Sequence, residues 1–194
     1  MTNHEDPQFT IDKEIAAFDA DPETAIAEST IGKLILTYPT NLDSDQVLVK
    51  VITINALYHA RVLDVDLLPL AKHIAGIEAL DTRLEQGDPE VVDAIWYSQG
   101  TRHHYPSFAT KFCNWHNSEA YAIYNGNVWE ALVAYRTKGG LFDFSEREFV
   151  KYVTFLAIVR KFQSSYGLHS YSLKNVDKFL WRVGDRLIAE RSNP

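Results

Sequence analysis

The sequence predicts an all-α fold, arranged as a single orthogonal bundle of helices. Helix-start residues recur along the 194 residues, and apolar residues follow them at helical spacing. No alternating apolar run flanked by turn pairs indicates a strand, and there are no repeats or Pro/Gly/Ser-rich linkers. We therefore predict one helical domain over residues 11–191, with a flexible N-terminal tail at residues 1–10.

The first predicted helices lie in the acidic N-terminal half. Asp21-Pro22 places a capping residue before a proline at the first helical position. Asp43 with Gln46 resembles a capping box ahead of Val47–Tyr58. The apolar surface of that segment is wide, which predicts a central and largely buried helix, although its β-branched residues would also suit a strand.

Residues typical of helix starts and helix ends define four further helices. A short amphipathic helix over 67–74 stops at Gly76, and Asp88-Pro89 begins the next helix. Ser145 with Glu148 forms a capping box ahead of another helix. Ser172 can cap the last helix, whose apolar residues have the most regular spacing of the chain: Val176, Phe179, Leu180, Val183 and Leu187.

Composition and charge narrow the function classes. A single cysteine, Cys113, excludes an intramolecular disulfide and a cysteine-based zinc site. We expect a soluble, cytoplasmic protein without a membrane span, because no signal-peptide core and no sufficiently long apolar run is present. Residues 1–100 carry 18 acidic and 6 basic residues, whereas residues 101–194 carry 8 acidic and 13 basic residues. The C-terminal half could therefore face phosphates, or the two halves could differ by chance or attract each other.

The most informative stretch runs from Ser107 to Leu132. It contains a short predicted helix, Lys111–Trp115, then a polar loop, and a second predicted helix, Val128–Tyr135. Aromatic residues crowd this stretch, and such clusters usually form core because each ring buries a large apolar area.

The stretch resembles the helix-hairpin-helix DNA glycosylase superfamily, and within it the 8-oxoguanine DNA glycosylase branch. The resemblance covers about 25 residues and implies a helix-hairpin-helix glycosylase-like fold. It places Lys111 at the position of the catalytic lysine and Asn125 at that of the catalytic aspartate, with Trp129 four residues later. In such enzymes the lysine attacks C1′ of the damaged nucleoside and the flipped base is stacked in a pocket. The residues that could line this pocket are His104, Trp115, His116, Tyr124 and Trp129.

Two features differ from that family pattern. Asn125 is an amide, which is neither a base nor an anion, so the electrostatic contribution of the aspartate is lost. The residues before Lys111 include no hairpin glycine that would let the backbone approach a phosphate. The stretch also resembles an uncharacterised group of small bacterial helical proteins that share the segment Ser107–Cys113 and a following His-Asn pair.

The sequence gives little support for a metal site or for a catalytic cysteine. No histidine spacing typical of a metal site occurs, no cofactor is indicated, and Cys113 is best read as a small core residue. Whether the protein is an enzyme stays open at this point. The sequence favours a non-catalytic interaction module, with a protein partner or a homodimer. The alternative is a DNA-binding or DNA-repair glycosylase/lyase relative that uses Lys111 and binds DNA through the basic C-terminal half. A small-molecule pocket is a third possibility.

Overall fold

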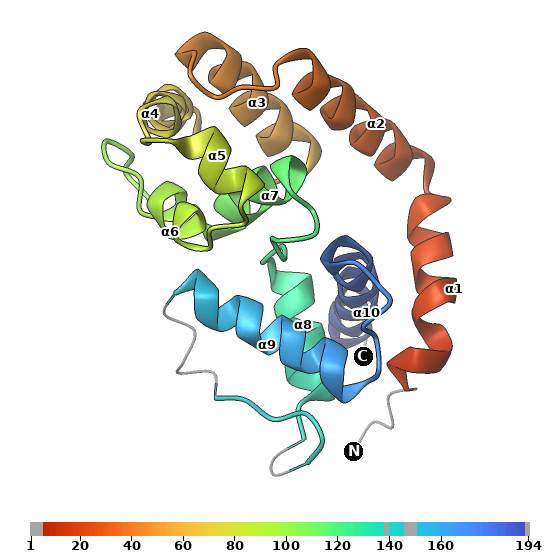
Figure 1. The fold of residues 1–194 in the computed structure, drawn as a ribbon. Helices are drawn as coiled ribbons and strands as arrows, with labels where there is room; N and C mark the ends of the chain where they lie inside the picture. The colour runs from red at the N-terminus through yellow and green to blue at the C-terminus, as the bar shows by residue number, and fades with distance from the viewer. Residues whose placement is uncertain (1–5, 138–139, 146–150, 193–194) are drawn as a thin grey trace. The chain divides into compact units, whose positions relative to one another are not determined.

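The computed structural model describes residues 6–137, 140–145 and 151–192. In these residues the chain is helical, without strands, which confirms the predicted all-α class (Figure 1). The helices are α1 (Pro7–Asp19), α2 (Pro22–Thr37), α3 (Ser44–Leu57), α4 (Asp64–Ala75), α5 (Leu80–Glu85), α6 (Glu90–Trp96), α7 (Pro106–His116), α8 (Gly126–Tyr135), α9 (Tyr152–Ser165) and α10 (Leu173–Ser192). Among the described residues, none of these helices has the length and apolar character needed to cross a membrane.

The chain divides into two units. Unit 1 joins Met1–Pro22 to Ala122–Pro194 and holds α1, α8, α9 and α10. Unit 2 is the continuous segment Glu23–Tyr121, with α3–α7 and nearly all of α2. Residues 7–10, which the sequence suggested as part of a tail, form the first turn of α1.

Local capping explains where several helices begin. The Asp43 carboxylate accepts a hydrogen bond of 2.8 Å from the backbone amide of Asp45, which satisfies a free N–H in the first turn of α3. The Gln46 side chain donates to the same carboxylate at 3.4 Å. Ser172 caps α10, accepting from the backbone amide of Asn175 at 3.1 Å. The predicted box at Ser145 and Glu148 lies partly outside the described residues.

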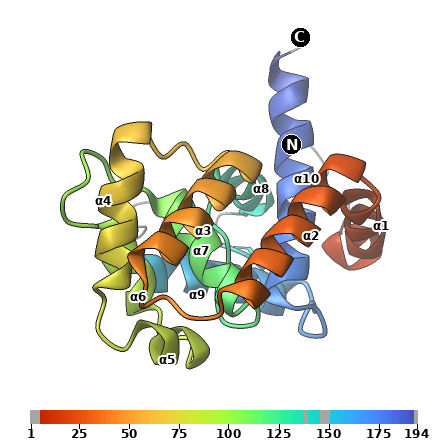
Figure 2. The same ribbon diagram turned by 90° about the horizontal axis from the view of Figure 1, so that it is seen from above.

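Unit 2 is built on two helix pairs, α3 with α4 and α6 with α7. Figure 2 shows α4 beside α3, and Figure 1 shows α6 beside α7. The expectation of a largely buried helix at 47–58 is only half right. The inner face of α3 is fully buried, including Val47, Val51 and Ile54. Its outer face keeps Val49 and Ile52 exposed, because the apolar pattern of α3 is wider than the surface that its neighbours cover.

Unit 1 packs α8 against α10 and α1 against α10. The first contact is close because Gly184 of α10 has no side chain where the backbone of Asn127 passes. The second contact is ionic. Glu14 of α1 is buried and accepts hydrogen bonds from Arg182 at 3.2 Å and Arg186 at 2.9 Å. Burial by itself raises the pKa of Glu14, but these two guanidinium groups outweigh it and hold the pKa below its ordinary value.

Candidate functional site

Lys111 lies on α7 with its side chain buried in unit 2. Its ammonium donates a 2.8 Å hydrogen bond to the backbone carbonyl of Tyr58, the residue that ends α3, and lies 5.8 Å from the centre of the Tyr58 ring. Carbonyl groups at a helix C-terminus lack partners within the helix, and a cation there is favoured by the helix dipole. In this geometry Lys111 completes the end of α3.

Asn125 caps α8 in unit 1. Its side-chain oxygen accepts a 3.0 Å hydrogen bond from the backbone amide of Val128, so the Asn125-Gly126 dipeptide begins a helix. Asparagine and aspartate are almost equally good in this position. The Asn125 amide, which can act neither as a base nor as an anion in catalysis, is therefore well suited to capping. Lys111 and Asn125 belong to different units.

The residues proposed as a pocket fall into separate groups. In unit 2, His104 precedes α7 and meets the edge of Tyr97 at 5.0 Å. Trp115 and His116 lie at the other end of the same helix, about 15 Å away at 1.5 Å of rise per residue. The structure therefore does not bring His104 together with these two. In unit 1, Tyr124 and Trp129 contact each other at 6.4 Å, and Tyr124 meets Phe155 at 5.4 Å.

A buried polar cluster of unit 2 was not predicted from the sequence. Lys50 of α3 is fully buried and donates to the carbonyl of Thr40 at 3.0 Å and to the side-chain oxygen of Asn41 at 2.7 Å. Asn41 in turn donates to both carboxylate oxygens of Asp81, at 3.1 and 2.6 Å. The signal was available, because Lys50 sits at a core position of the apolar repeat, three residues after Val47 and four before Ile54.

Burial sets the protonation chemistry of this cluster. It lowers the pKa of Lys50 to about 8, although the charge of Asp81 opposes this effect. His116, in contact with Phe112 at 4.9 Å, is affected in the same way: burial first, and then the charge of Lys50, lower its pKa to about 4. These groups connect α3, α5, α7 and the α2–α3 loop. Because Lys50 is fully buried, the cluster is structural: it holds these elements together inside unit 2.

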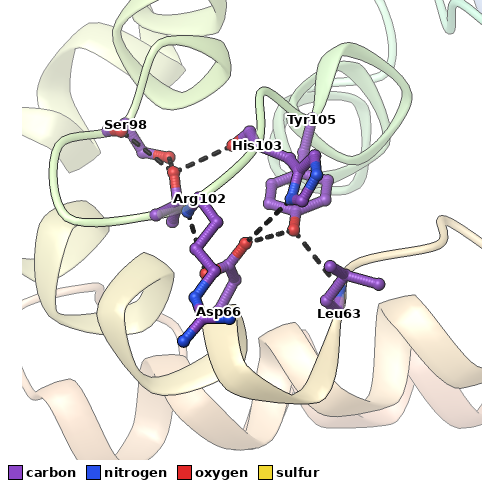
Figure 3. Close-up of polar contacts among 7 residues, drawn as sticks. Leu63, Asp66, Ser98, Arg102, His103 and Tyr105 are labelled. Atoms are coloured by element: carbon purple, nitrogen blue, oxygen red, sulfur yellow. Dashed lines mark hydrogen bonds and ion pairs between the residues drawn. The ribbon is translucent and has the colours of Figure 1, made fainter.

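A second polar cluster holds the loop between α6 and α7 onto α4 (Figure 3). Asp66 of α4 is buried and accepts hydrogen bonds from the Tyr105 hydroxyl and, at 2.9 Å, from the backbone amide of Arg102. The exposed His103 places Nδ1 at 3.7 Å from the same carboxylate. Of the two carboxylates in the first turn of α4, Asp64 is exposed and only Asp66 is buried.

The geometry of this loop cluster fixes its charge state. Burial by itself raises the pKa of the Asp66 carboxyl, but the hydrogen bonds that it accepts outweigh burial and leave the pKa below its ordinary value. Burial and the neighbouring Asp66 raise the pKa of Tyr105 to about 12. The Thr101 hydroxyl lies 3.0 Å from the Ser98 carbonyl oxygen. The cluster therefore holds an anion and a neutral phenol together and fixes the backbone of the loop.

Comparison with known proteins places the chain in a family. A model described as HI_0787_N, N-terminal domain, matches residues 10–120, and this match ends one residue before unit 2 does. An uncharacterized protein of Haemophilus influenzae (strain ATCC 51907 / DSM 11121 / KW20 / Rd) is 30% identical over 184 residues, which cover 90% of this chain and 88% of that relative. No solved structure matches. The chain belongs to the HI_0787_N family.

Proposed function

We propose that this protein is a non-catalytic protein-binding module, with its binding face on the outer surface of α3 and α4. One observation carries the proposal. Val49 and Ile52 of α3 are 43% and 46% exposed, and on the neighbouring α4, Val65 and Leu68 are 54% and 46% exposed. We call these four side chains the α3–α4 face. Large apolar side chains exposed on two helices that pack together are typical of interfaces, because covering them releases ordered water.

The charge distribution supports a protein rather than a nucleic acid as the partner. Unit 2 carries 13 acidic and seven basic residues, and two of the seven, Lys50 and Lys111, are buried. Phosphate backbones are bound by exposed cations, which this unit has in small number. Of the 13 basic residues of the C-terminal half, 11 lie in unit 1. There Lys178, Arg182 and Arg186 pair with acidic residues of α1.

The alternative function is a DNA-binding or lyase activity on a glycosylase-like fold. It depends on the local motif around Lys111 and Asn125. For such chemistry the Lys111 amine would have to leave the Tyr58 carbonyl and become a neutral nucleophile. Both requirements oppose the geometry described above, and the interaction module is therefore the better-supported proposal.

The test compares a variant of the α3–α4 face with a matched control. Ile52→Ser/Val65→Ser alters the face, and Ile188→Ser/Val153→Ser removes the same side chains from exposed positions of unit 1 that are 38% and 51% exposed. A protein captured by the wild type is identified, purified and titrated against all three. We expect the face variant to weaken binding at least about tenfold and the control to leave it unchanged.

Two outcomes would contradict the proposal. One is equal binding of the purified partner to the wild type and to the face variant. The other is a covalent adduct with abasic-site DNA, trapped by borohydride, that forms with the wild type and is lost in Lys111→Ala. The second outcome would support the lyase alternative directly.

A further inference from the structure

The residues that flank the α3–α4 face indicate what kind of partner it accepts. On α3, Asp45 is exposed and lies one turn before Val49, and on α4, Asp64 is exposed beside Val65. Asp43, which caps α3, is exposed at the same end as Asp45. Two exposed cations also flank the face, Arg61 three residues before α4 begins and Lys72 one turn after Leu68. The rim of the face therefore carries three exposed carboxylates and two exposed cations, and its balance is acidic.

The outward row of α3, from its acidic end through its apolar residues, has the length of a short helix. Along α3 the outward positions Asp45, Val49, Ile52 and Ala56 are exposed and follow one another at spacings of four, three and four residues. This row covers about three helical turns, or roughly 16 Å at 1.5 Å per residue. A helix with apolar residues at the same spacing can lay them along this row, as amphipathic helices do on other apolar surfaces.

Charge also decides between a foreign partner and a second copy of this chain. Two copies joined through this face would bring Asp45 and Asp64 of one copy against the acidic rim of the other. Unit 2 as a whole carries six more acidic than basic residues. Like charges brought together in an interface oppose association, whereas lysine and arginine on a partner would pair with the rim.

We propose that the α3–α4 face binds a basic amphipathic helix of about three turns, whose apolar side covers Val49, Ile52, Val65 and Leu68 while its lysine or arginine residues meet Asp45 and Asp64. This inference rests on the proposed function, because it names the chemistry of the partner for the same face. It adds the requirement that the partner be positively charged, which an apolar face alone would not impose.

The experiment uses three labelled synthetic peptides of equal length and the full chain. One carries leucine at helical spacing with lysine elsewhere, the second has glutamate in place of lysine, and the third contains the residues of the first in an order without helical spacing. Fluorescence anisotropy gives the affinity of each peptide. We expect the leucine–lysine peptide to bind and the other two to bind at least tenfold more weakly.

Variants of the chain locate the binding. Ile52→Ser/Val65→Ser should weaken the leucine–lysine peptide at least tenfold, and Ile188→Ser/Val153→Ser should not. Asp45→Asn/Asp64→Asn should weaken it several-fold and reduce the dependence on salt, because exposed ion pairs are screened by salt. Circular dichroism of each variant shows whether it keeps its helical content, and these exposed positions are chosen so that it does.

Several results would overturn the inference. The glutamate peptide or the unpatterned peptide binding as well as the leucine–lysine peptide would remove the requirement for charge or for helical spacing. Equal weakening by the face variant and the unit 1 control would place binding elsewhere. A wild-type dimer in light scattering that Ile52→Ser/Val65→Ser dissociates would assign the face to a second copy. If the captured partner depends on the face but the peptide does not bind, only the partner chemistry is wrong and the proposed function stands.

Discussion

Two buried ionisable side chains, His116 and Lys50, dominate the chemistry of this protein at the scale of single residues. Each is held in an environment that disfavours its charged form. His116 affects stability at acidic pH and Lys50 at alkaline pH. Burial of a base makes the folded state bind its proton less tightly than the unfolded state does. The stability of the fold therefore depends on pH through both residues, and substitution can separate their contributions.

His116 should make the protein sensitive to acid. Its folded-state pKa of about 4 lies below the ordinary 6.5, so between these values the unfolded chain binds a proton that the folded chain does not. The free energy of unfolding should therefore fall by about 3 kcal/mol between pH 7 and pH 4 from this residue alone. Urea unfolding of the wild type and His116→Phe measures the difference. Two curves that remain parallel over this range would contradict the prediction.

Lys50 should have the opposite effect at alkaline pH. Its pKa of about 8 in the folded state lies below the ordinary 10.5, so above pH 8 the folded chain releases its proton first and gains stability. From pH 7 to 9.5 the wild type should gain about 2 kcal/mol relative to Lys50→Met. Measurements stop at pH 9.5, because buried tyrosines such as Tyr105 act in the other direction above pH 10. A constant difference between the two proteins would refute this assignment.

At the scale of helices, α8 and α10 approach each other closely at one glycine. A Cβ atom on Gly184 would lie 1.8 Å from the carbonyl oxygen of Asn127, so Gly184→Ala must force the two helices apart. We expect a loss of about 3 kcal/mol in unfolding free energy, or failure to fold. Gly126→Ala is the matched control, since nothing lies within 4 Å of the added atom, and it should change stability by less than about 1 kcal/mol. Thermal unfolding compares them, and equal effects would exclude the close contact.

The loop between α6 and α7 should depend on a single carboxylate of α4. Asp66→Ala removes the acceptor for the Arg102 amide and the Tyr105 hydroxyl, so the Arg102 amide should exchange its hydrogen faster with solvent. Asp64→Ala changes an exposed residue two positions earlier on the same helix and should leave exchange unchanged. Hydrogen exchange followed by mass spectrometry resolves this segment. Unchanged exchange in Asp66→Ala would show that the loop is fixed by other contacts.

The helices themselves were predictable where their signals are local. Asp43 and Ser172 are followed by the backbone amides that they cap, so three or four residues of sequence contain the whole interaction. The exposed outer face of α3 was not predictable, since an apolar repeat does not reveal whether a neighbour covers it. The partners of Asp66 were also hidden, because its hydrogen bonds join residues 36 and 39 positions apart. Those of Lys50 lie nine and ten residues away, in a loop whose path the sequence pattern does not reveal.

At the scale of the whole molecule, the charge asymmetry of the sequence corresponds to contacts inside unit 1. The acidic α1 faces the basic α10, so that Lys178 pairs with Asp19, and Arg182 and Arg186 pair with Glu14. Of the explanations that the sequence left open for its acidic and basic halves, attraction between them accounts for these residues. The pairing required a structure, since 168 residues separate Glu14 from Arg182.

Glu14 should therefore contribute to stability in a way that depends on pH. Glu14→Gln should cost about 1 kcal/mol at pH 7, a value reduced because both arginines are partly exposed to solvent. The folded-state pKa of Glu14 lies below its ordinary value, so the contribution is fully present above the ordinary carboxyl pKa and is lost as pH falls through the folded-state pKa. The control, Glu130→Gln, breaks the more exposed pair with Arg191 and should cost less. Chemical denaturation of the wild type and Glu14→Gln at pH 7 and pH 3 checks this prediction. A difference in unfolding free energy that is as large at pH 3 as at pH 7 would contradict it.

Unit 1 is discontinuous, and this has a consequence for how the protein is made. A nascent chain leaves the ribosome in the order of its sequence, so α1 emerges before unit 2, while α10, its partner, emerges after unit 2. Unit 2 is a continuous segment, so all of its residues are available once Tyr121 has been made, and it should fold during translation. During that interval α1 lacks α10 and is exposed to chaperones and proteases. Completion of α10 is thus the event that protects α1.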